Sequence, residues 1–477
     1  MLSKTKIDYR ISLIIFIVAL LLTVFCQVVD FPLIIPLLML ILGGHLFFQR
    51  QADYKMYLHL SLLLILIVFT AHAIREYTDF SLLYVPVASV AMLTILLFND
   101  LQLAFFMSFS SSILVSLVWG GDLKVMLVFF IGSLTASYTV CDARTRGRLI
   151  AAGFYVSIMQ VVCMALMNPD IHYLITKEFA LDILRPLFIN GFISAFVVVA
   201  TLKIFELLFG VLTNFSLMEL SDFNQPLLKR MILEAPGTYH HSIVVSNLAE
   251  AAADAIGANS MLCRVGAYYH DIGKMEKAEY FTENQLVGSN KHDNIEPSIS
   301  RLVILNHVKE GIELAKKNKL NPLIVDFIPQ HHGTSLMHYF YQKALEEAEE
   351  DASIGEENYR YPGPKPQKRE TAIVLLADSV EAATRSIDEA NPQKIEEVVR
   401  KIINNKFIDG QLDECNITLK EIELIALTFT RILGAMYHSR IKYPEKKSTH
   451  DDRSEKSTEE SSDNPSQDHQ DRKESSK

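Results

Sequence analysis

The fold of the second half of this 477-residue chain is decided by the stretch Val265-Gly-Ala-Tyr-Tyr-His-Asp-Ile-Gly-Lys274. His270 and Asp271 lie near the end of a predicted helix, so an imidazole and a carboxylate project from nearly one point. A carboxylate has two oxygens and can bridge two cations about 3.5–4 Å apart. Gly273 allows a tight turn directly afterwards, and Lys274 adds a cation. The stretch therefore predicts a metal centre at a helix end.

Histidines are concentrated on both sides of this stretch. Eight of the fifteen lie between residues 240 and 338. Asp378 directly follows the apolar run 373–377, where an unpaired charge would be costly. Neutral imidazoles and carboxylates, without thiolates, are typical ligands of Zn, Mn or Fe in hydrolytic sites. We therefore expect these side chains to bind metal.

The residues predict two ligand groups that share one carboxylate. One metal would be held by His241, His270 and Asp378, the other by His307, His331 and His332, with Asp271 as the bridge. Such a pair would lower the pKa of a bridging water and neutralise phosphate oxygens. Asp271 and Lys274 are the predicted catalytic residues, because Lys274 would place its cation beside the phosphate.

The other histidines are left outside the ligand set. His240 is expected to support the ligands from outside the centre, because adjacent side chains on a helix point about 100° apart, and His292 is expected in a loop or facing the substrate. His338, His438, His450 and His469 are expected to be structural or solvated. A single His-Asp pair or His-His doublet is common by chance, so the prediction depends on the combination.

Most of the second half is predicted to be helical, with no alternation of period two. Apolar residues recur at helical spacing from Pro236 until Gly257, and a second helix is predicted from Asn259 to His270. Further helices are expected to begin near Pro297, Pro322, Glu370, Pro392 and Thr418. Residues 346–369 are expected to form a long loop. Residues 446–477 contain no strongly apolar side chain and are expected to be disordered.

The first half carries apolar runs of the length that membrane helices need. A helix requires about 20 residues to cross a hydrocarbon core of about 30 Å. Eight such runs are present, at residues 11–28, 32–49, 57–74, 80–98, 102–119, 123–140, 149–167 and 187–213. The first is expected to be retained, because no small-residue cleavage site follows Cys26. The fold class is therefore all-α, a polytopic transmembrane bundle followed by a helical domain.

Five segments follow from these patterns. They are a membrane anchor at 1–31, a seven-helix membrane domain at 32–213, an amphipathic juxtamembrane connector at 214–235, a globular domain at 236–445 and a charged tail at 446–477. Basic residues are more frequent in alternate loops, for example at Arg144, Arg146 and Arg148, so both ends and the globular domain are expected on the cytosolic side.

Composition excludes several function classes. The net charge of −10 lies mainly in the second half and tail, which argues against duplex nucleic acid as a partner. The five cysteines form no CxxC pair, so we expect neither disulfides nor a zinc–thiolate site. Ionisable groups inside the spans are few, with His45, His59 and His72 among them, and they form no chain of acids and bases, so the membrane half is predicted to be an anchor or sensor.

The sequence resembles the HD phosphohydrolase superfamily in the residues His241, His270-Asp271-Ile-Gly-Lys274 and Asp378. Its wider context is similar to one branch, the bacterial seven-transmembrane HD phosphodiesterases of cyclic di-AMP, over roughly residues 32–440. Besides 265–274, the matching stretches are Glu234-Ala-Pro-Gly-Thr-Tyr-His-His-Ser242, Glu279-Tyr-Phe-Thr-Glu-Asn-Gln285, Asn306-His-Val-Lys-Glu-Gly311, Gln330-His-His-Gly-Thr334, Tyr361-Pro-Gly-Pro-Lys-Pro366 and Ala377-Asp-Ser-Val-Glu-Ala-Ala383.

The resemblance implies a pair of iron or manganese ions that hydrolyse cyclic di-AMP to linear pApA in a bacterial plasma membrane. The family's seven ligand positions correspond to His241, His270, Asp271, His307, His331, His332 and Asp378. Members usually carry an extracytoplasmic domain between the first span and the other seven, whereas only residues 27–31 separate the first two runs here. That domain is therefore expected to be absent. The expected partners are a cyclic dinucleotide and membrane lipid, with a homodimer left open.

Two alternatives to this function remain open. The same chemistry could act on cyclic di-GMP, a guanosine alarmone or a nucleoside triphosphate. The complete two-metal set disfavours the one-metal hydrolases, and Gly333-Thr334-Ser335 replaces the Gly-Tyr-Pro element of the cyclic di-GMP branch. The domain could also serve as a membrane receptor that only binds nucleotide, although intact ligands argue against that reading.

Overall fold

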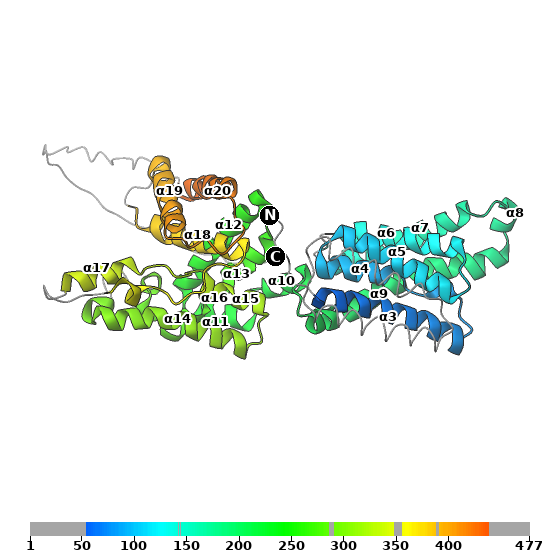
Figure 1. Cartoon of the computed structure of the whole chain (residues 1–477), viewed down its shortest axis with the longest axis horizontal. Coiled ribbons are helices and arrows are strands. Elements are labelled where there is room, and N and C mark those ends of the chain that lie inside the picture. Colours follow the sequence, from blue (N-terminus) through cyan, green and yellow to red (C-terminus); the bar gives the residue numbers. More distant parts are fainter. Residues whose placement is uncertain are drawn as a thin grey trace, which may run out of the picture.

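The structure, a computed structural model, describes residues 54–141, 143, 145–285, 291–347, 355–387 and 391–437. The predicted spans at 11–28 and 32–49, the membrane anchor and the charged tail lie outside these residues. The described part consists of helices without a strand, apart from one isolated bridge between Leu336 and Arg360. The all-α prediction is confirmed. Figure 1 shows a membrane-type helix bundle and a second helical domain side by side, with α10 (Asn214–Leu220) between them.

From residue 54 onward, where the structure describes the bundle, five helices are long and apolar enough to cross a membrane. They are α3 (Tyr54–Tyr77), α5 (Leu101–Val118), α6 (Leu123–Val140), α7 (Arg146–Leu166) and α9 (Arg185–Phe209), the last preceded by the short α8 (Ile171–Leu174) and η2 (Phe179–Leu184). These helices follow the predicted runs closely. The last predicted span is too long, because Gly210 adopts a left-handed conformation and ends α9.

The predicted span at 80–98 is not one continuous helix. It begins with the short 3-10 turn η1 (Leu82–Tyr84), and only α4 (Ala88–Phe98) is a regular α-helix. Pro86 lacks an N–H and restricts the residue before it, so the helix cannot extend further back. Two carbonyls freed by this break, those of Leu83 and Val85, accept hydrogen bonds of 2.9 and 2.7 Å from Nδ2 of Asn190 on α9. The break is thus satisfied inside the bundle, as a membrane interior requires.

The predicted connector forms two short helices. These are α10 and α11 (Pro226–Glu234), and the intervening residues 221–225 are irregular. The hydroxyl of Tyr269 donates a 2.9 Å hydrogen bond to the carbonyl of Leu220 at the end of α10. The ring of Phe223 packs against Tyr239 and Tyr268. The connector therefore belongs to the core of the second domain.

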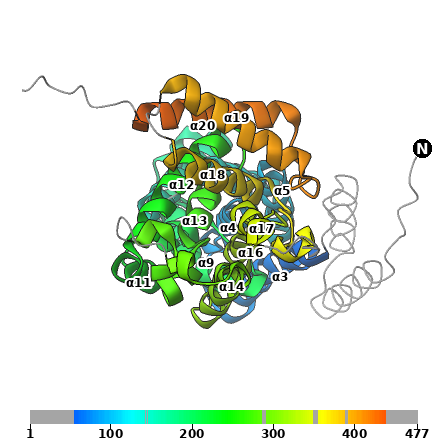
Figure 2. The same ribbon diagram turned by 90° about the vertical axis from the view of Figure 1, so that its left-hand side faces the viewer.

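The second domain is built around two long helices, α12 (Pro236–Ile256) and α18 (Arg369–Arg385), which contact each other. Both also contact α13 (Ser260–Tyr269), while α19 (Pro392–Ile408) and α20 (Leu419–Tyr437) cover one side (Figure 2). The other side holds η3 (Ile272–Tyr280), α14 (Pro297–Lys317), α15 (Pro322–Val325), α16 (Phe327–Gln330) and α17 (His338–Glu347).

The predicted helix boundaries agree with these bounds within one or two residues. Pro236 occupies the first turn of α12, and Gly257 ends it with a φ of +66°. Helix α17 was not predicted. In the described part of the predicted loop, a 3-10 turn, η6 (Glu356–Tyr359), precedes chain without regular secondary structure that continues to α18.

Candidate metal centre

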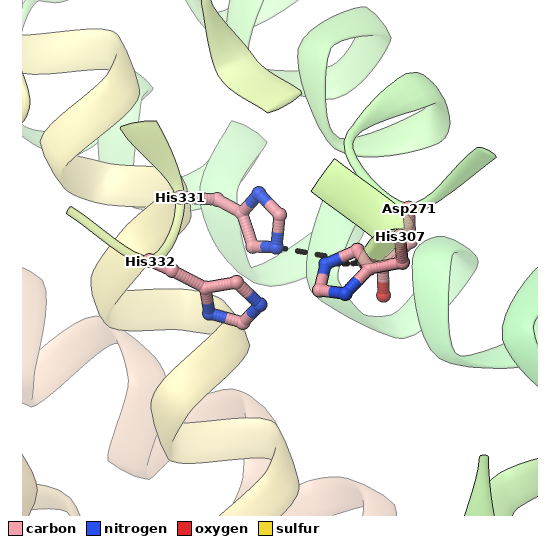
Figure 3. Close-up of side chains that lie close together, drawn as sticks. All are labelled: Asp271, His307, His331 and His332. Atoms are coloured by element: carbon pink, nitrogen blue, oxygen red, sulfur yellow. Dashed lines mark ion pairs between the residues drawn. The ribbon is translucent and has the colours of Figure 1, made fainter. Parts of the chain in front are cut away.

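The structure brings all seven predicted ligands together from five places in the chain. Helix α12 supplies His241, the end of α13 supplies His270 and Asp271, α14 supplies His307, the turn after α16 supplies His331 and His332, and α18 supplies Asp378. They form two groups, Asp271 with His307, His331 and His332 (Figure 3), and His241 with His270 and Asp378. Within each group the candidate ligand atoms lie within 4.8 Å of one another.

Asp271 lies between the two groups. Its Oδ1 is 3.5 Å from Nε2 of both His307 and His331, while its Oδ2 is 3.2 Å from Nε2 of His270 and 3.6 Å from Nε2 of His241. One oxygen of the same carboxylate therefore faces each group. This is the geometry expected of a bridging ligand.

Local sequence explains how the centre is assembled. Gly273 allows η3 to lie directly on α14, because a Cβ at this position would be 1.8 Å from the carbonyl oxygen of His307. Asp378 follows the apolar run 373–377, all of which is fully buried in the core. The carboxylate is thus fixed by the packing of α18, whereas His307 is fixed by its contact with the turn that follows Asp271.

Several polar atoms in the centre have no hydrogen-bond partner among the described residues. They are Nε2 of His270, His307, His331 and His332, together with Oδ1 of Asp271. Leaving a buried polar atom unpaired costs about 1–3 kcal/mol. Coordination of divalent metal by these lone pairs would remove that cost, so the residues present fit a pair of metal ions.

Burial keeps the imidazoles of His331 and His332 neutral. It lowers the pKa of His331 to about 3 and that of His332 well below its usual range, and neighbouring imidazoles add to both effects. A neutral imidazole retains the lone pair that a metal needs. His241 behaves differently, because hydrogen bonds to Asp378 and Glu381 outweigh its burial and raise its pKa to about 9.

A cavity of about 400 Å³ opens beside His307 and His332. Lys274 and Glu283 line it and form an ion pair of 2.9 Å. Aromatic side chains make up much of the remaining wall, namely Tyr280, Phe281, Tyr339, Phe340 and Tyr361. The ring of Tyr361 stacks on that of His332 with the centroids 4.0 Å apart. The space next to the centre therefore combines one cation with apolar surfaces suited to a flat ring.

Residues outside the predicted ligand set fall in different places. His292 is buried and lines the cavity, with Nε2 2.8 Å from the carbonyl oxygen of Tyr280, and its substrate-facing position stays a prediction. His338 is exposed, which agrees with its predicted solvated position, whereas His240 is exposed although it was expected to support the ligands. The remaining predicted non-ligands lie beyond residue 437, outside the described part.

Sequence reasoning missed Glu381, whose Oε2 lies 2.7 Å from Nδ1 of His241. The signal was present, because Glu381 follows Asp378 by three residues and therefore shares its helix face. No individual role was predicted for Glu283 or Tyr361 either. Nothing in their spacing connects them to the histidines.

Family models identify both halves of the chain. Residues 33–213 match a family described as a 7TM receptor with intracellular HD hydrolase, and residues 238–383 match the HD domain. The chain belongs to this 7TM–HD family. It is therefore a membrane protein whose HD domain implies dependence on divalent metal. The resemblance noted in the sequence is confirmed at this level.

Relatives of this 7TM–HD protein include two curated bacterial proteins. The cyclic-di-AMP phosphodiesterase PgpH of Bacillus subtilis is 39% identical over 80% of this chain and 54% of its own length. PgpH of Listeria monocytogenes is 41% identical over 76% of this chain and 50% of its own. The chain thus spans about half the length of the curated relatives it matches. The crystal structure of the L. monocytogenes PgpH HD domain in complex with cyclic di-AMP is 51% identical, with a TM-score of 0.44, over 46% of this chain and all of that one.

Proposed function

We propose that this protein hydrolyses one phosphodiester bond of cyclic di-AMP to give linear pApA. The observation that carries the proposal is the position of Asp271, whose two oxygens each face a different group of imidazoles. Two-metal centres of this kind are used for displacement at phosphorus. The choice of substrate is supported by the two relatives described as cyclic-di-AMP phosphodiesterases.

The proposed cofactor is a pair of iron or manganese ions. The proposed ligands are His241, His270, Asp271, His307, His331, His332 and Asp378. When bound, the ions would activate water as the nucleophile and neutralise charge on the phosphate. Imidazole and carboxylate ligands without a thiolate suit such metals.

The chain's own residues would bind and orient the substrate. Lys274 lies at the boundary between the centre and the cavity, where its charge would stabilise phosphate oxygens as negative charge develops. The aromatic wall of the cavity would hold a base and exclude water. Asp271 would keep the two ligand groups at a fixed separation.

The proposed location is the bacterial plasma membrane, with the HD domain in the cytosol. Arg146, at the first turn of α7, lies 3.6 Å from Glu219 of α10, so this basic loop is at the end of the bundle that faces the HD domain. An excess of basic residues marks the cytosolic side. The division into segments at residues 31, 213, 235 and 445 is part of the same proposal.

The direct test is a product assay with the purified full chain in detergent. Metal-free protein would be loaded with Mn²⁺ or Fe²⁺ and incubated separately with cyclic di-AMP, cyclic di-GMP, a guanosine alarmone and a nucleoside triphosphate. We expect pApA from cyclic di-AMP as the main product. Asp271→Asn keeps the shape of the side chain but removes the shared charge, so it should reduce turnover by more than about 100-fold.

Two results would overturn the proposal. If the loaded protein leaves cyclic di-AMP intact and hydrolyses another of these nucleotides, the substrate is wrong. If Asp271→Asn retains normal turnover, the centre is not the catalytic site.

A further inference from the structure

Three histidines of the centre are oriented by the backbone of their own helical turns. Nδ1 of His270 lies 2.7 Å from the carbonyl oxygen of Ala267, and Nδ1 of His331 lies 3.1 Å from that of Phe327. Nδ1 of His307 contacts the carbonyl oxygen of Ile304 in the same way. A carbonyl only accepts hydrogen bonds, so each Nδ1 carries the proton and each Nε2 offers its lone pair to the centre.

His241 is oriented by a side chain instead. Its Nδ1 lies 2.7 Å from Oε2 of Glu381, and its Nε2 lies 3.0 Å from Oδ1 of Asp378. Glu381 comes from α18, whereas His241 is on α12, so this contact joins two helices. Glu381 is 4% exposed, and none of the described residues places a backbone carbonyl against this Nδ1.

Arg385 contacts both Glu381 and His241, and it favours a different tautomer of His241 from the one that Glu381 favours. Its guanidinium donates to Oε1 of Glu381 and also lies 3.3 Å from Nδ1 of His241. An ionised carboxylate can only accept, whereas a guanidinium can only donate. With Glu381 present, Nδ1 keeps its proton, so a metal ion can displace the proton that Nε2 shares with Asp378 and bind the Nε2 lone pair. With Glu381 absent, Arg385 would favour the other tautomer, in which Nε2–H points at the centre and blocks coordination.

We propose that Glu381 is a positioning residue that fixes the tautomer and ring orientation of His241 for metal binding. Arg385 holds Glu381 in place and offsets the cost of burying its charge. Outer partners of this kind typically contribute 10–100-fold to metal affinity. The inference rests on the proposed metal centre and does not depend on which nucleotide is hydrolysed.

The test measures metal binding by the full chain in detergent, without substrate. Metal-free protein would be titrated with Mn²⁺ against a chelator, and bound metal would be counted per chain. Glu381 acts on one of the two ligand groups. Glu381→Ala should therefore weaken the binding of one of the two ions by about 10–100-fold and leave the affinity for the other ion unchanged. Glu381→Gln should lose less affinity than Glu381→Ala, because its amide oxygen can still accept from Nδ1–H, although its amide nitrogen no longer accepts from Arg385.

The chain offers a closely matched control. Glu396 and Arg400 on α19 form another Glu–Arg pair at spacing i,i+4, at 2.9 Å. Glu396→Ala removes the same charge from an exposed pair, so both ions should bind as in the wild type. Adding Arg385→Ala to Glu381→Ala removes the competing donor and should restore part of the lost affinity. Neither the rescue by Gln nor this restoration is expected if Glu381 is merely structural.

The inference is overturned if Glu381→Ala binds both ions with unchanged affinity, or if Glu381→Gln loses as much as Glu381→Ala. Should Glu381→Ala fail to fold, the comparison of Glu381→Gln with Glu381→Leu decides the question, because only Gln can accept from Nδ1–H. If one ion is lost as expected while wild-type protein leaves cyclic di-AMP intact, the proposed substrate fails and the role of Glu381 stands.

Discussion

Nζ of Lys274 lies 2.7 Å from Oδ2 of Asp271, the oxygen that faces His241 and His270. Both side chains are largely buried, and Lys274 also pairs with Glu283. Burial opposes the charge on each group. The pKa of Asp271 is nevertheless lowered, by His270 and by Lys274, and the pKa of Lys274 is raised, by the carboxylates of Asp271 and Glu283. The lysine therefore remains a cation at the edge of the centre throughout the physiological pH range.

Replacing this cation should separate catalysis from metal binding. We expect Lys274→Met to lower kcat for cyclic di-AMP by about 100–1,000-fold, because a positive charge beside the phosphate is lost. Bound Mn²⁺ should stay at the wild-type level, since no ligand is removed. Steady-state kinetics and metal analysis of the same samples check both points. A kcat within a few-fold of wild type would show that Lys274 does not act on the phosphate.

Gly273 should tolerate no side chain. A Cβ there would be 1.8 Å from the carbonyl oxygen of His307 and 2.5 Å from the amide nitrogen of Gly311, both of which are backbone atoms. Gly273→Ala must displace α14 and with it His307, so we expect a loss of about 3 kcal/mol in stability together with weaker metal binding.

The matched control for this change is Gly434→Ala in α20, where an added Cβ meets nothing within 4 Å. That substitution should stabilise the protein by about 0.5–1 kcal/mol, because alanine is favoured over glycine in a helix. Thermal unfolding of both variants in detergent tests the pair. Similar unfolding temperatures for the two would contradict the close approach at Gly273.

Removal of metal should destabilise the HD domain. A ligand present at 100 times its Kd stabilises the folded state by about 2.7 kcal/mol per site. For a domain of this size that corresponds to an unfolding temperature lower by about 5–10 °C after chelation. Added Mn²⁺ or Fe²⁺ should restore it, and Asp271→Asn should show a smaller response. An unfolding temperature that does not change when chelator is added would argue against a metal centre.

The ion pair between Arg360 and Asp409 predicts a pH effect far from neutrality. Burial raises the pKa of Asp409, but hydrogen bonds from Arg360, at 2.8 and 3.2 Å, and from Gln411 lower it below its ordinary value of 3.8. Stability from a depressed carboxyl pKa is present above about pH 4 and disappears as pH falls through the folded-state value.

Asp409→Asn should therefore destabilise the protein by about 1 kcal/mol at pH 7, with little difference from wild type near pH 2–3. Thermal unfolding across this range measures the difference. A constant gap between the two proteins at all pH values would assign the effect to packing and not to ionisation.

Helix positions could be predicted where the residues themselves start or stop a helix. Pro236 and Gly257 bound α12 because proline suits a first turn and glycine adopts the left-handed end, and both effects are local. The span at 80–98 was predicted too long because its hydrophobicity concealed the effect of Pro86. Its freed carbonyls are satisfied by Asn190, about a hundred residues away, and such a partner leaves no local signal.

The sequence by itself determined which side chains form the candidate centre. Histidines concentrated in one region, together with an aspartate in an apolar helix, indicate ligands of a common metal centre. It also determined the membrane character of the first half, since helix length and hydrophobicity are local properties. Only the tertiary structure decided that each oxygen of Asp271 faces one group, that Glu381 holds His241 and that an aromatic cavity adjoins His332. These relations depend on how separate helices pack, and packing is set by long-range contacts that spacing along one chain does not encode.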